Sequence, residues 1–346
     1  MEKGEIVAKR YKVEELLGRG GMAFVFKVLD ELDPSRPKAL KLLSFQQDTD
    51  PSLKRFKREF DLCLRIRHPN IVNLYDFGQL DNGMPFYTMD YLPFPSLDEL
   101  LSRQGPFKEE HCIEIIKGLG RALSHCHRLG IVHRDLKPAN VMVKGKSKAI
   151  LVDFGLAKAQ YRTALTQTGT LVGTPYYMSP EVLRGERAEE SADVWALATL
   201  AYEMLRGSPP FSGDDFNELI TAIIFSEPKE INIFRTDLQR DWKSFFERGL
   251  TKEKEDRPKS IKELLSILEH EKHLEELPIH RSERRPLLLL SSALALAMLL
   301  AASILSQPSS QSYGVEDLEM NPRIGALELC WRSRKAYPTR VLMKKP

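Results

Sequence analysis

Apolar and polar residues alternate through the first part of the chain in the manner of short β-strands. One strand-like stretch covers residues 11–17 and another covers residues 23–28, where β-branched and aromatic residues are enriched. A glycine-rich turn at residues 18–21 separates them. The pattern therefore predicts a small lobe that is rich in β-structure.

Helical periodicity replaces this alternation farther along the chain. Pro51 suits a first helical turn, and apolar residues recur at every fourth position, which predicts a helix that runs through Ile66. A capping box at residues 96–99 and an apolar stripe over residues 113–126 predict helices in a later, larger lobe. The last globular helix is expected at residues 261–268. The fold class that follows is α+β, with two lobes.

A long apolar segment stands near the C-terminus, where residues 287–305 contain no charge. As a helix it would be about 28 Å long, close to the hydrocarbon thickness of roughly 30 Å in a bilayer. A buried core helix is the alternative, but a globular helix without a polar face is uncommon. Basic residues crowd the preceding juxtamembrane linker 269–286. We therefore expect a single transmembrane helix, with the preceding part cytoplasmic and the short tail 306–346 on the opposite side.

Composition and charge narrow the function classes. The chain has 51 Lys and Arg against 48 Asp and Glu, a formal net charge of +3, which gives no overall attraction for nucleic acid. The four cysteines show no CxxC spacing, so neither a zinc site nor a disulfide framework is indicated. Cys330 in the tail has two interpretations, a free thiol or a link between two chains. Residues 1–10 form a short extension without the apolar core of a secretory signal.

The first candidate chemistry lies in the β-rich part. The pattern Gly18-x-Gly20-x-x-Ala23 alone could also open a dinucleotide-binding unit. Strand-like alternation follows it, which favours a strand-turn-strand flap whose backbone N–H groups cover phosphates. Lys41 lies in an apolar run, and Glu59 follows on the next predicted helix. An ion pair between Lys41 and Glu59 is therefore sterically reasonable.

The most specific motifs come later, as His-Arg-Asp-Leu-Lys-Pro-Ala-Asn at residues 133–140 and Asp-Phe-Gly from Asp153. With these motifs in this order, residues 11–268 resemble the eukaryotic-type (Hanks-type) serine/threonine protein kinases, including bacterial membrane-anchored members. The resemblance implies a bilobal protein-kinase fold, with an N-lobe at about 11–91 and a C-lobe at about 92–268. It also implies transfer of the γ-phosphate of ATP to Ser or Thr hydroxyls of protein substrates, with Mg²⁺ or alternatively Mn²⁺.

The catalytic roles follow from the resemblance, position by position. Asp135 would be the catalytic base that orients the substrate hydroxyl or accepts its proton. Lys137 would place a positive charge near the transferred phosphate, and this lysine is typical of serine/threonine kinases. Asn140 and Asp153 would hold Mg²⁺ through oxygen ligands. Thr174 resembles the threonine that contacts the catalytic Asp and Lys and so positions the substrate.

Nucleotide binding is expected mainly in the small lobe. Lys41 would bind the α- and β-phosphates while Glu59 holds it in place. The residues expected around the nucleotide come from the turn, the strands after it and the segment that begins at the gatekeeper position: Gly18, Arg19, Gly20, Gly21, Met22, Ala23, Val25, Ala39, Lys41, Met89, Asp90 and Leu92. Ala23 replaces the third glycine of the loop, a change that removes no backbone donor.

Regulation and a structural ion pair are further implications of the resemblance. Arg134 precedes the catalytic Asp, and an arginine there usually needs an anion from the activation loop, which Lys158 could share. Autophosphorylation would supply it, and a transient or stable homodimer would serve this reaction in trans. The candidate acceptors are Thr166, Thr168 and Thr170. Glu181 is expected to pair with Arg257.

The main alternative function is a pseudokinase that acts as a membrane scaffold. It predicts the loss of a residue that handles protons, metal or phosphate, but all four are present: Lys41, Asp135, Asn140 and Asp153. One departure from the family pattern lies elsewhere. Ala198 replaces the glycine expected after Asp193-Val194-Trp195, which suggests slightly altered helix packing.

Overall fold

The computed structural model describes residues 1–20, 23–43, 51–153, 175–233 and 235–269. These residues belong to one compact unit, 1–274, whereas the second unit, 275–346, lies outside the described residues. The predicted transmembrane helix 287–305 falls in that second unit. No helix among the described residues is long and apolar enough to cross a membrane.

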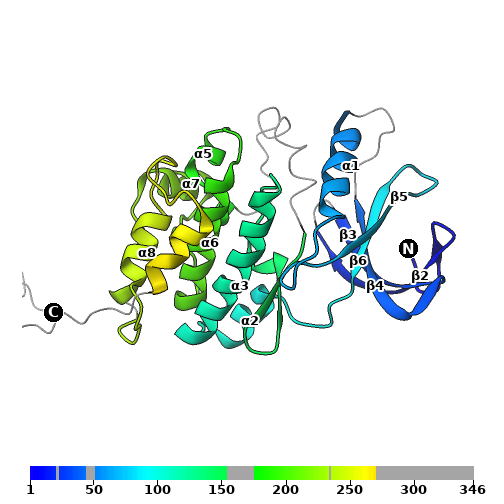
Figure 1. Cartoon of the computed structure of the whole chain (residues 1–346), viewed down its shortest axis with the longest axis horizontal. Helices are drawn as coiled ribbons and strands as arrows, with labels where there is room; N and C mark the ends of the chain where they lie inside the picture. The colour runs from blue at the N-terminus through cyan, green and yellow to red at the C-terminus, as the bar shows by residue number, and fades with distance from the viewer. Residues whose placement is uncertain (21–22, 44–50, 154–174, 234, 270–346) are drawn as a thin grey trace, which may run out of the picture. The chain divides into compact units, whose positions relative to one another are not determined.

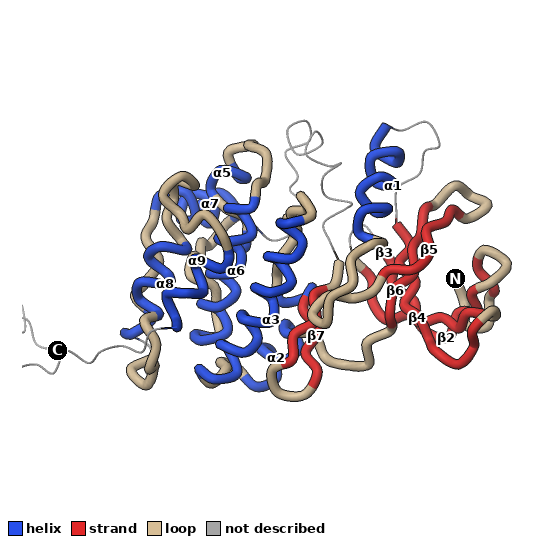
Figure 2. The backbone as a smooth tube through the Cα atoms, in the orientation of Figure 1, coloured by secondary structure: helices blue, strands red, loops and turns tan. Residues whose placement is uncertain are grey.

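A six-stranded antiparallel sheet forms the small lobe, in the order β1-β2-β3-β4-β6-β5 (Figure 2). Its strands are β1 (Ile6–Val7), β2 (Tyr11–Arg19), β3 (Ala23–Asp30), β4 (Asp33–Leu43), β5 (Leu74–Gln79) and β6 (Pro85–Asp90). The pairing of β2 with β3 is closed by the Gly20 N–H, which donates to the Ala23 carbonyl at 2.8 Å. The strand-turn-strand prediction is therefore confirmed, and a dinucleotide-binding βαβ unit is excluded here.

The register of the sheet brings Lys41 to the middle of one face. Lys41 stands opposite Val25 on β3 and opposite Tyr87 on β6. Because side chains alternate along a strand, Ala39 shares the face of Lys41. This face joins the large hydrophobic core of the chain, whereas Leu40 and its neighbours form a separate small cluster. The sheet thus turns one face toward the second lobe.

Helix α1 (Pro51–Cys63) lies against this face. Its contact is made through Phe60, whose ring centroid is 5.5 Å from that of Tyr87. The predicted end at Ile66 was wrong, because the Ile66 N–H bonds only three residues back, to Cys63. A three-residue bond of this kind is a turn tighter than the α-helix, so the helix ends earlier than the apolar spacing indicated.

The large lobe is mostly helical, as predicted (Figure 1). Its elements are α2 (Leu97–Gln104), α3 (Glu109–Arg128), η1 (Pro138–Asn140), the hairpin β7 (Val141–Lys144) and β8 (Lys148–Leu151), η3 (Pro175–Tyr177), α5 (Pro180–Leu183), α6 (Glu190–Arg206), α7 (Phe216–Phe225), η4 (Ile231–Ile233), α8 (Trp242–Gly249), α9 (Ile261–Ser266) and η5 (Ile267–Glu269). The capping prediction holds, since the Ser96 hydroxyl accepts the Glu99 N–H at 3.1 Å. Helix α6 is buried along nearly its whole length and forms the centre of the lobe.

Ala198 of α6 packs against a glycine of α8. A Cβ placed on Gly249 would come within 2.7 Å of the Ala198 Cβ. The two helices therefore approach closely enough that one of the two positions must lack a side chain. The methyl group that replaces the expected glycine at residue 198 is accommodated because residue 249 is glycine.

Part of the chain between α1 and β5 is bonded to the large lobe. The Val72 N–H donates to the Leu151 carbonyl at 3.0 Å, and the Leu151 N–H donates to the Asn70 carbonyl at 2.9 Å. The Asn70 side-chain amide donates to the Ala149 carbonyl at 2.7 Å. This junction attaches the segment that follows α1 to strand β8.

A buried ion pair between Glu181 and Arg257 ties α5 to the loop before α9, as the resemblance implied. Two guanidinium nitrogens lie 2.7 and 2.6 Å from the two carboxylate oxygens, and each residue is 2% exposed. Burial raises the pKa of Glu181, but the hydrogen bonds from Arg257 outweigh it and hold that pKa below its usual value. The pair is therefore ionised and desolvated.

A half-buried lysine lies beside this pair. The Lys252 ammonium is 4.0 Å from the ring centroid of Phe211 and donates to the Ile223 carbonyl at 2.9 Å. Burial lowers the pKa of Lys252 to about 8. Since the aromatic face and a carbonyl replace water around the ammonium, the charged form is less favoured here than in an unfolded chain.

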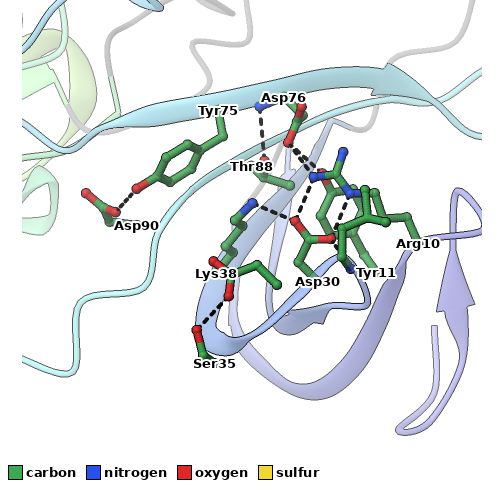
Figure 3. A network of polar contacts seen from close by, with 11 residues as sticks. Arg10, Tyr11, Asp30, Ser35, Lys38, Tyr75, Asp76, Thr88 and Asp90 are labelled. Carbon is green, nitrogen blue, oxygen red and sulfur yellow. Dashed lines mark hydrogen bonds and ion pairs between the residues drawn. The ribbon is translucent and has the colours of Figure 1, made fainter.

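A polar network stabilises the outer edge of the small lobe (Figure 3). Arg10 donates two hydrogen bonds of 2.7 Å to Asp30, and the Lys38 ammonium is also 2.7 Å from this carboxylate. The hydrogen bonds from Arg10 hold the pKa of Asp30 well below its usual range. Nearby, the buried Tyr11 hydroxyl donates to Asp76 at 2.7 Å. These bonds fix the start of β2 to the end of β3 and to β5.

Candidate active site

The loop that carries Asp135 is hydrogen-bonded to helix α6. The Asp193 carboxylate accepts the backbone N–H groups of His133 and Arg134 at 2.8 and 3.0 Å. Arg134 has φ +66°, a left-handed conformation that is unusual for a residue other than glycine. Such a conformation costs about 1–3 kcal/mol and persists only where the surroundings determine it. Asp193 is thus the group that shapes this loop.

His127 of α3 completes this support and was not predicted to act at the site. Its Nε2 lies 2.8 Å from Asp193 Oδ2, and its Nδ1 lies 3.5 Å from Glu190. Burial raises the pKa of Asp193, but the hydrogen bond with His127 and the charges near it outweigh this and lower it. The signal in the sequence was a polar side chain at the end of the apolar stripe of residues 113–126.

Asp135, Lys137 and Asn140 form one cluster. The Asn140 side-chain amide donates to the Asp135 backbone carbonyl at 2.7 Å and to its carboxylate at 3.0 Å. The Lys137 ammonium is 3.4 Å from the same carboxylate. Since the amide nitrogen of Asn140 is directed at Asp135, its amide oxygen is the atom that remains to serve as a metal ligand.

Asp153 connects this cluster to the small lobe. The Val152 N–H donates to the Asn140 carbonyl at 2.9 Å. This bond brings the backbone that precedes Asp153 to Asn140. The Asp153 carboxylate forms an ion pair with Lys41 of β4. Like Arg134, Asp153 has a left-handed backbone, with φ +60°. The structure thus brings together the four residues that distinguish a kinase from a pseudokinase in the sequence.

A tyrosine of the small lobe also reaches Asp153. The Tyr87 hydroxyl lies 3.1 Å from Asp153 Oδ1 and donates to it. Burial raises the pKa of Tyr87 well above its usual value, so the phenol stays protonated. Burial also raises the pKa of Asp153, but the Lys41 charge outweighs it, so the carboxylate stays ionised. Tyr87 was missed; strand alternation could have revealed it, because it lies two residues before Met89 and shares its face.

The ion pair expected between Lys41 and Glu59 is not the one that the structure contains. Among the described residues, the ion pair of Lys41 is with Asp153, and Glu59 lies 3.7 Å from Arg134. The physical reason is that two carboxylates and two cations meet between the lobes, and each cation takes the carboxylate that is nearer in this conformation. The sequence identified the charged residues, but Lys41 and Glu59 each have a partner other than the one expected.

The residues expected around the nucleotide are distributed over one face of the sheet and the adjoining segment. Val25, Ala39 and Met89 lie on that face, and Leu92 is half-buried after it. The Asp90 N–H donates to the Asn73 carbonyl at 3.1 Å. Of the two backbone groups of Asp90, the carbonyl is therefore the one expected to bond adenine. Gly18, Arg19 and Gly20 are exposed and Ala23 is half-buried. Gly21 and Met22 lie outside the described residues.

The Asp90 side chain is fixed by strand β5 and by the residue that precedes it. The Asn73 side-chain amide donates to this carboxylate at 2.8 Å, and the Tyr75 hydroxyl donates to it as well (Figure 3). Burial and the hydrogen bond to Asp90 raise the pKa of Tyr75 to about 12. These bonds fix the segment that links the lobes at the point where adenine is expected.

The regulatory and substrate-positioning candidates cannot be placed, except for Arg134. All of the others fall in residues 154–174, outside the described part of the chain: Lys158, Thr166, Thr168, Thr170 and Thr174. They stay predictions from the resemblance.

The donor set fits Mg²⁺ that is bound together with a nucleotide. Among the described residues no three His, Cys, Asp or Glu side chains gather into a metal cage. The protein instead offers an ionised carboxylate, Asp153, and an oriented amide oxygen, Asn140. Mg²⁺ prefers hard oxygen ligands and usually takes one or two from the protein and the rest from phosphate and water. Lys41, beside Asp153, is placed to bind the phosphates of the same nucleotide.

An antiparallel sheet joined to a helical lobe, with a lysine, two aspartates and an asparagine meeting between them, defines a bilobal phosphotransferase. The profile of the protein kinase domain matches residues 11–271. The chain therefore belongs to the protein kinase family.

Two curated relatives illustrate the similarity. The serine/threonine-protein kinase pkn3 of Myxococcus xanthus is 35% identical over 268 residues, which cover 74% of this chain and 49% of the relative. PknE of Mycobacterium tuberculosis is 37% identical over 248 residues, which cover 71% and 43%. The chain thus spans less than half the length of these relatives. Among solved structures, the PknI kinase domain of M. tuberculosis matches with a TM-score of 0.62 at 27% identity, over 78% of this chain and 98% of that one.

Proposed function

We propose that this chain is an active serine/threonine protein kinase that transfers the γ-phosphate of ATP to Ser or Thr hydroxyls of proteins. The observation that carries the proposal is a series of contacts that join Asp135 to Asn140, Asn140 to the backbone beside Asp153, and Asp153 to Lys41 of the other lobe. Membership in the kinase family and the similarity to named serine/threonine kinases support it.

The residues of the chain would divide the work of phosphotransfer. Asp135 orients the acceptor hydroxyl and takes its proton, and Asn140 holds this carboxylate in place. Lys137, 3.4 Å from Asp135, adds positive charge where the phosphate is transferred. Lys41 binds the nucleotide phosphates, and Asp153 and Asn140 hold Mg²⁺. When bound, Mg²⁺ neutralises phosphate charge.

The test incubates the purified full chain, in detergent, with γ-labelled ATP, Mg²⁺ and candidate protein substrates. Wild-type protein should yield phosphoserine and phosphothreonine. Asp135→Asn should lower the transfer by about 10²–10⁴-fold, the usual contribution of a positioned base. Undiminished transfer by Asp135→Asn would exclude the proposed role of that carboxylate, and absence of transfer by the wild type would oppose kinase activity.

A membrane anchor belongs to the same proposal. Residues 287–305 would span the bilayer and contact its lipid, with the kinase part cytoplasmic and the tail 306–346 on the other side. The support is the uncharged apolar sequence and its basic N-terminal flank. Protease treatment of sealed vesicles with the cytoplasmic face outward should digest the kinase part and protect the tail. Protection of the kinase part would reverse the orientation, and recovery of the chain in the aqueous fraction would exclude the anchor.

Activation by autophosphorylation is the last part of the proposed function. The support within the described residues is Arg134, whose guanidinium meets a carboxylate from the small lobe and so has an affinity for anions. Phosphorylation at Thr166, Thr168 or Thr170 would offer a stronger anion, and a homodimer would allow transfer in trans. Phosphosite mapping with and without Asp135→Asn tests this: phosphate on these threonines should appear only in the active chain. Full activity of a chain that is unmodified in this loop would refute it.

A further inference from the structure

Tyr87 occupies a place from which it contacts both the small lobe and the metal-binding aspartate. Its position in β6 is directly opposite Lys41 in the sheet register. The side chain is 2% exposed, and the ring packs on Phe60 of α1, with 5.5 Å between centroids. The hydroxyl crosses between the lobes to Asp153, at 3.1 Å from Oδ1. The ring and the hydroxyl therefore make different contacts, and a Tyr→Phe change would remove only the second.

The two oxygens of Asp153 have separate partners. Lys41 pairs with Oδ2, whereas the Tyr87 hydroxyl donates to Oδ1. An ammonium on a flexible stem behaves as a point charge and fixes direction weakly. A phenol whose ring is packed offers one O–H from a fixed place. Since the Asp153 backbone is already in an unusual left-handed conformation, the direction of its carboxylate depends on such contacts.

We propose that Tyr87 is a positioning residue of the phosphotransfer site, whose hydroxyl orients the Asp153 carboxylate for Mg²⁺. This inference rests on the proposed function, since it concerns the metal that accompanies the nucleotide. Partners that orient a metal ligand typically contribute about 10–100-fold to metal affinity or activity. The loss of the Tyr87 hydroxyl should therefore weaken Mg²⁺ binding, whereas the ring contact with α1 is kept.

The experiment compares the full chain, in detergent, with Tyr87→Phe. Mg²⁺ is titrated into each protein in the presence of a saturating non-hydrolysable ATP analogue, and binding is followed by the rise in the thermal unfolding temperature. Tyr87→Phe should raise the half-saturating Mg²⁺ concentration by about tenfold. The unfolding temperature without ligand should stay close to that of the wild type. The kcat at limiting Mg²⁺ should fall, whereas the KM for ATP at saturating Mg²⁺ should change little.

Tyr11→Phe is the matched control. The Tyr11 side chain is also 2% exposed and also donates a phenol hydrogen bond to a carboxylate, Asp76, in the same lobe. It has no contact with Asp153 among the interactions of the described residues. Tyr11→Phe should leave the Mg²⁺ titration unchanged. An equal rise in half-saturating Mg²⁺ in both variants would show a general loss of stability and would overturn the proposal.

A second background separates positioning from a structural role. In Asp153→Asn the carboxylate that Tyr87 is proposed to orient is gone, so adding Tyr87→Phe should produce no further loss of Mg²⁺ binding. A further tenfold loss would show that Tyr87 acts elsewhere. An unchanged titration for Tyr87→Phe in an otherwise wild-type chain would sink the inference and leave the proposed function intact. If the wild-type chain binds no nucleotide with Mg²⁺, the proposed function itself fails.

Discussion

Removing one partner of the buried pair of Glu181 and Arg257 should strongly lower the stability of the fold. Arg257→Met deletes both hydrogen bonds to Glu181 and leaves its carboxylate, 2% exposed, without its counter-charge. It also removes the donors to the carbonyls of Thr251 and Lys252. Breaking a buried pair in this way costs about 3–5 kcal/mol. For a domain of this size that corresponds to a fall in Tm of roughly 6–20 °C.

Replacing both partners tests whether the cost is that of an unpaired charge. The double variant Glu181→Leu with Arg257→Met removes both charges of the pair, so it should unfold at a higher temperature than Arg257→Met alone, with most or all of the about 3–5 kcal/mol recovered. Thermal unfolding of the full chain, followed by tryptophan fluorescence, provides the measurement for both variants.

Acid provides an independent check with a defined sign. Because the pKa of Glu181 lies below 4.5 in the folded chain, the stabilisation by its charge is complete above about pH 4.5 and is lost as the pH falls through the folded value. The gap in Tm between wild type and Arg257→Met should therefore narrow in acid. A Tm for Arg257→Met within about 2 °C of the wild type at neutral pH would refute the reasoning.

Three further predictions concern other parts of the large lobe. The pKa of Lys252 is about 8 in the fold against 10.5 as a free side chain, so its contribution to stability should rise between those pH values; Lys252→Met should lack this rise in urea unfolding measured across that window. Gly249→Ala should cost about 1–3 kcal/mol, because its Cβ would stand 2.7 Å from that of Ala198, and Ala198→Gly in the same chain should recover part of the loss in the same assay. Asp193→Asn should lower phosphate transfer by about 100-fold through displacement of the catalytic loop, with a smaller effect on binding of an ATP analogue; equal loss of both would contradict this role.

Local rules determined much of the fold, which is why so many elements could be predicted from the sequence. Alternation around the glycine-rich turn predicted the pairing of β2 and β3, and Ser96 with Glu99 predicted the start of α2. The motif at residues 133–140 identified the catalytic loop because phosphate transfer requires these residue types. Each of these signals lies within a few residues of sequence.

The features that escaped prediction depend on distances between the lobes. The partner of Lys41 is chosen among carboxylates that are far apart in the sequence, and no spacing encodes which is nearer. Tyr87 was not identified from the sequence, since its function depends on Asp153, which is 66 residues away. The end of α1 was also misplaced, because apolar spacing continues through turns that are tighter than a helix.

The bonds of Asn70 and Val72 to β8 attach the segment that follows α1 to the large lobe. If the sheet rotated against the large lobe, this helix would turn about its C-terminal end, and displacement would grow along its 13 residues, a lever arm of about 20 Å. Glu59 stands only four residues, or about 6 Å, from the end at Cys63. A tilt of about 20° therefore carries this carboxylate by only about 2 Å. A displacement that would be large at Pro51 would thus be reduced at Glu59 to about the distance that separates one ion-pair partner from another.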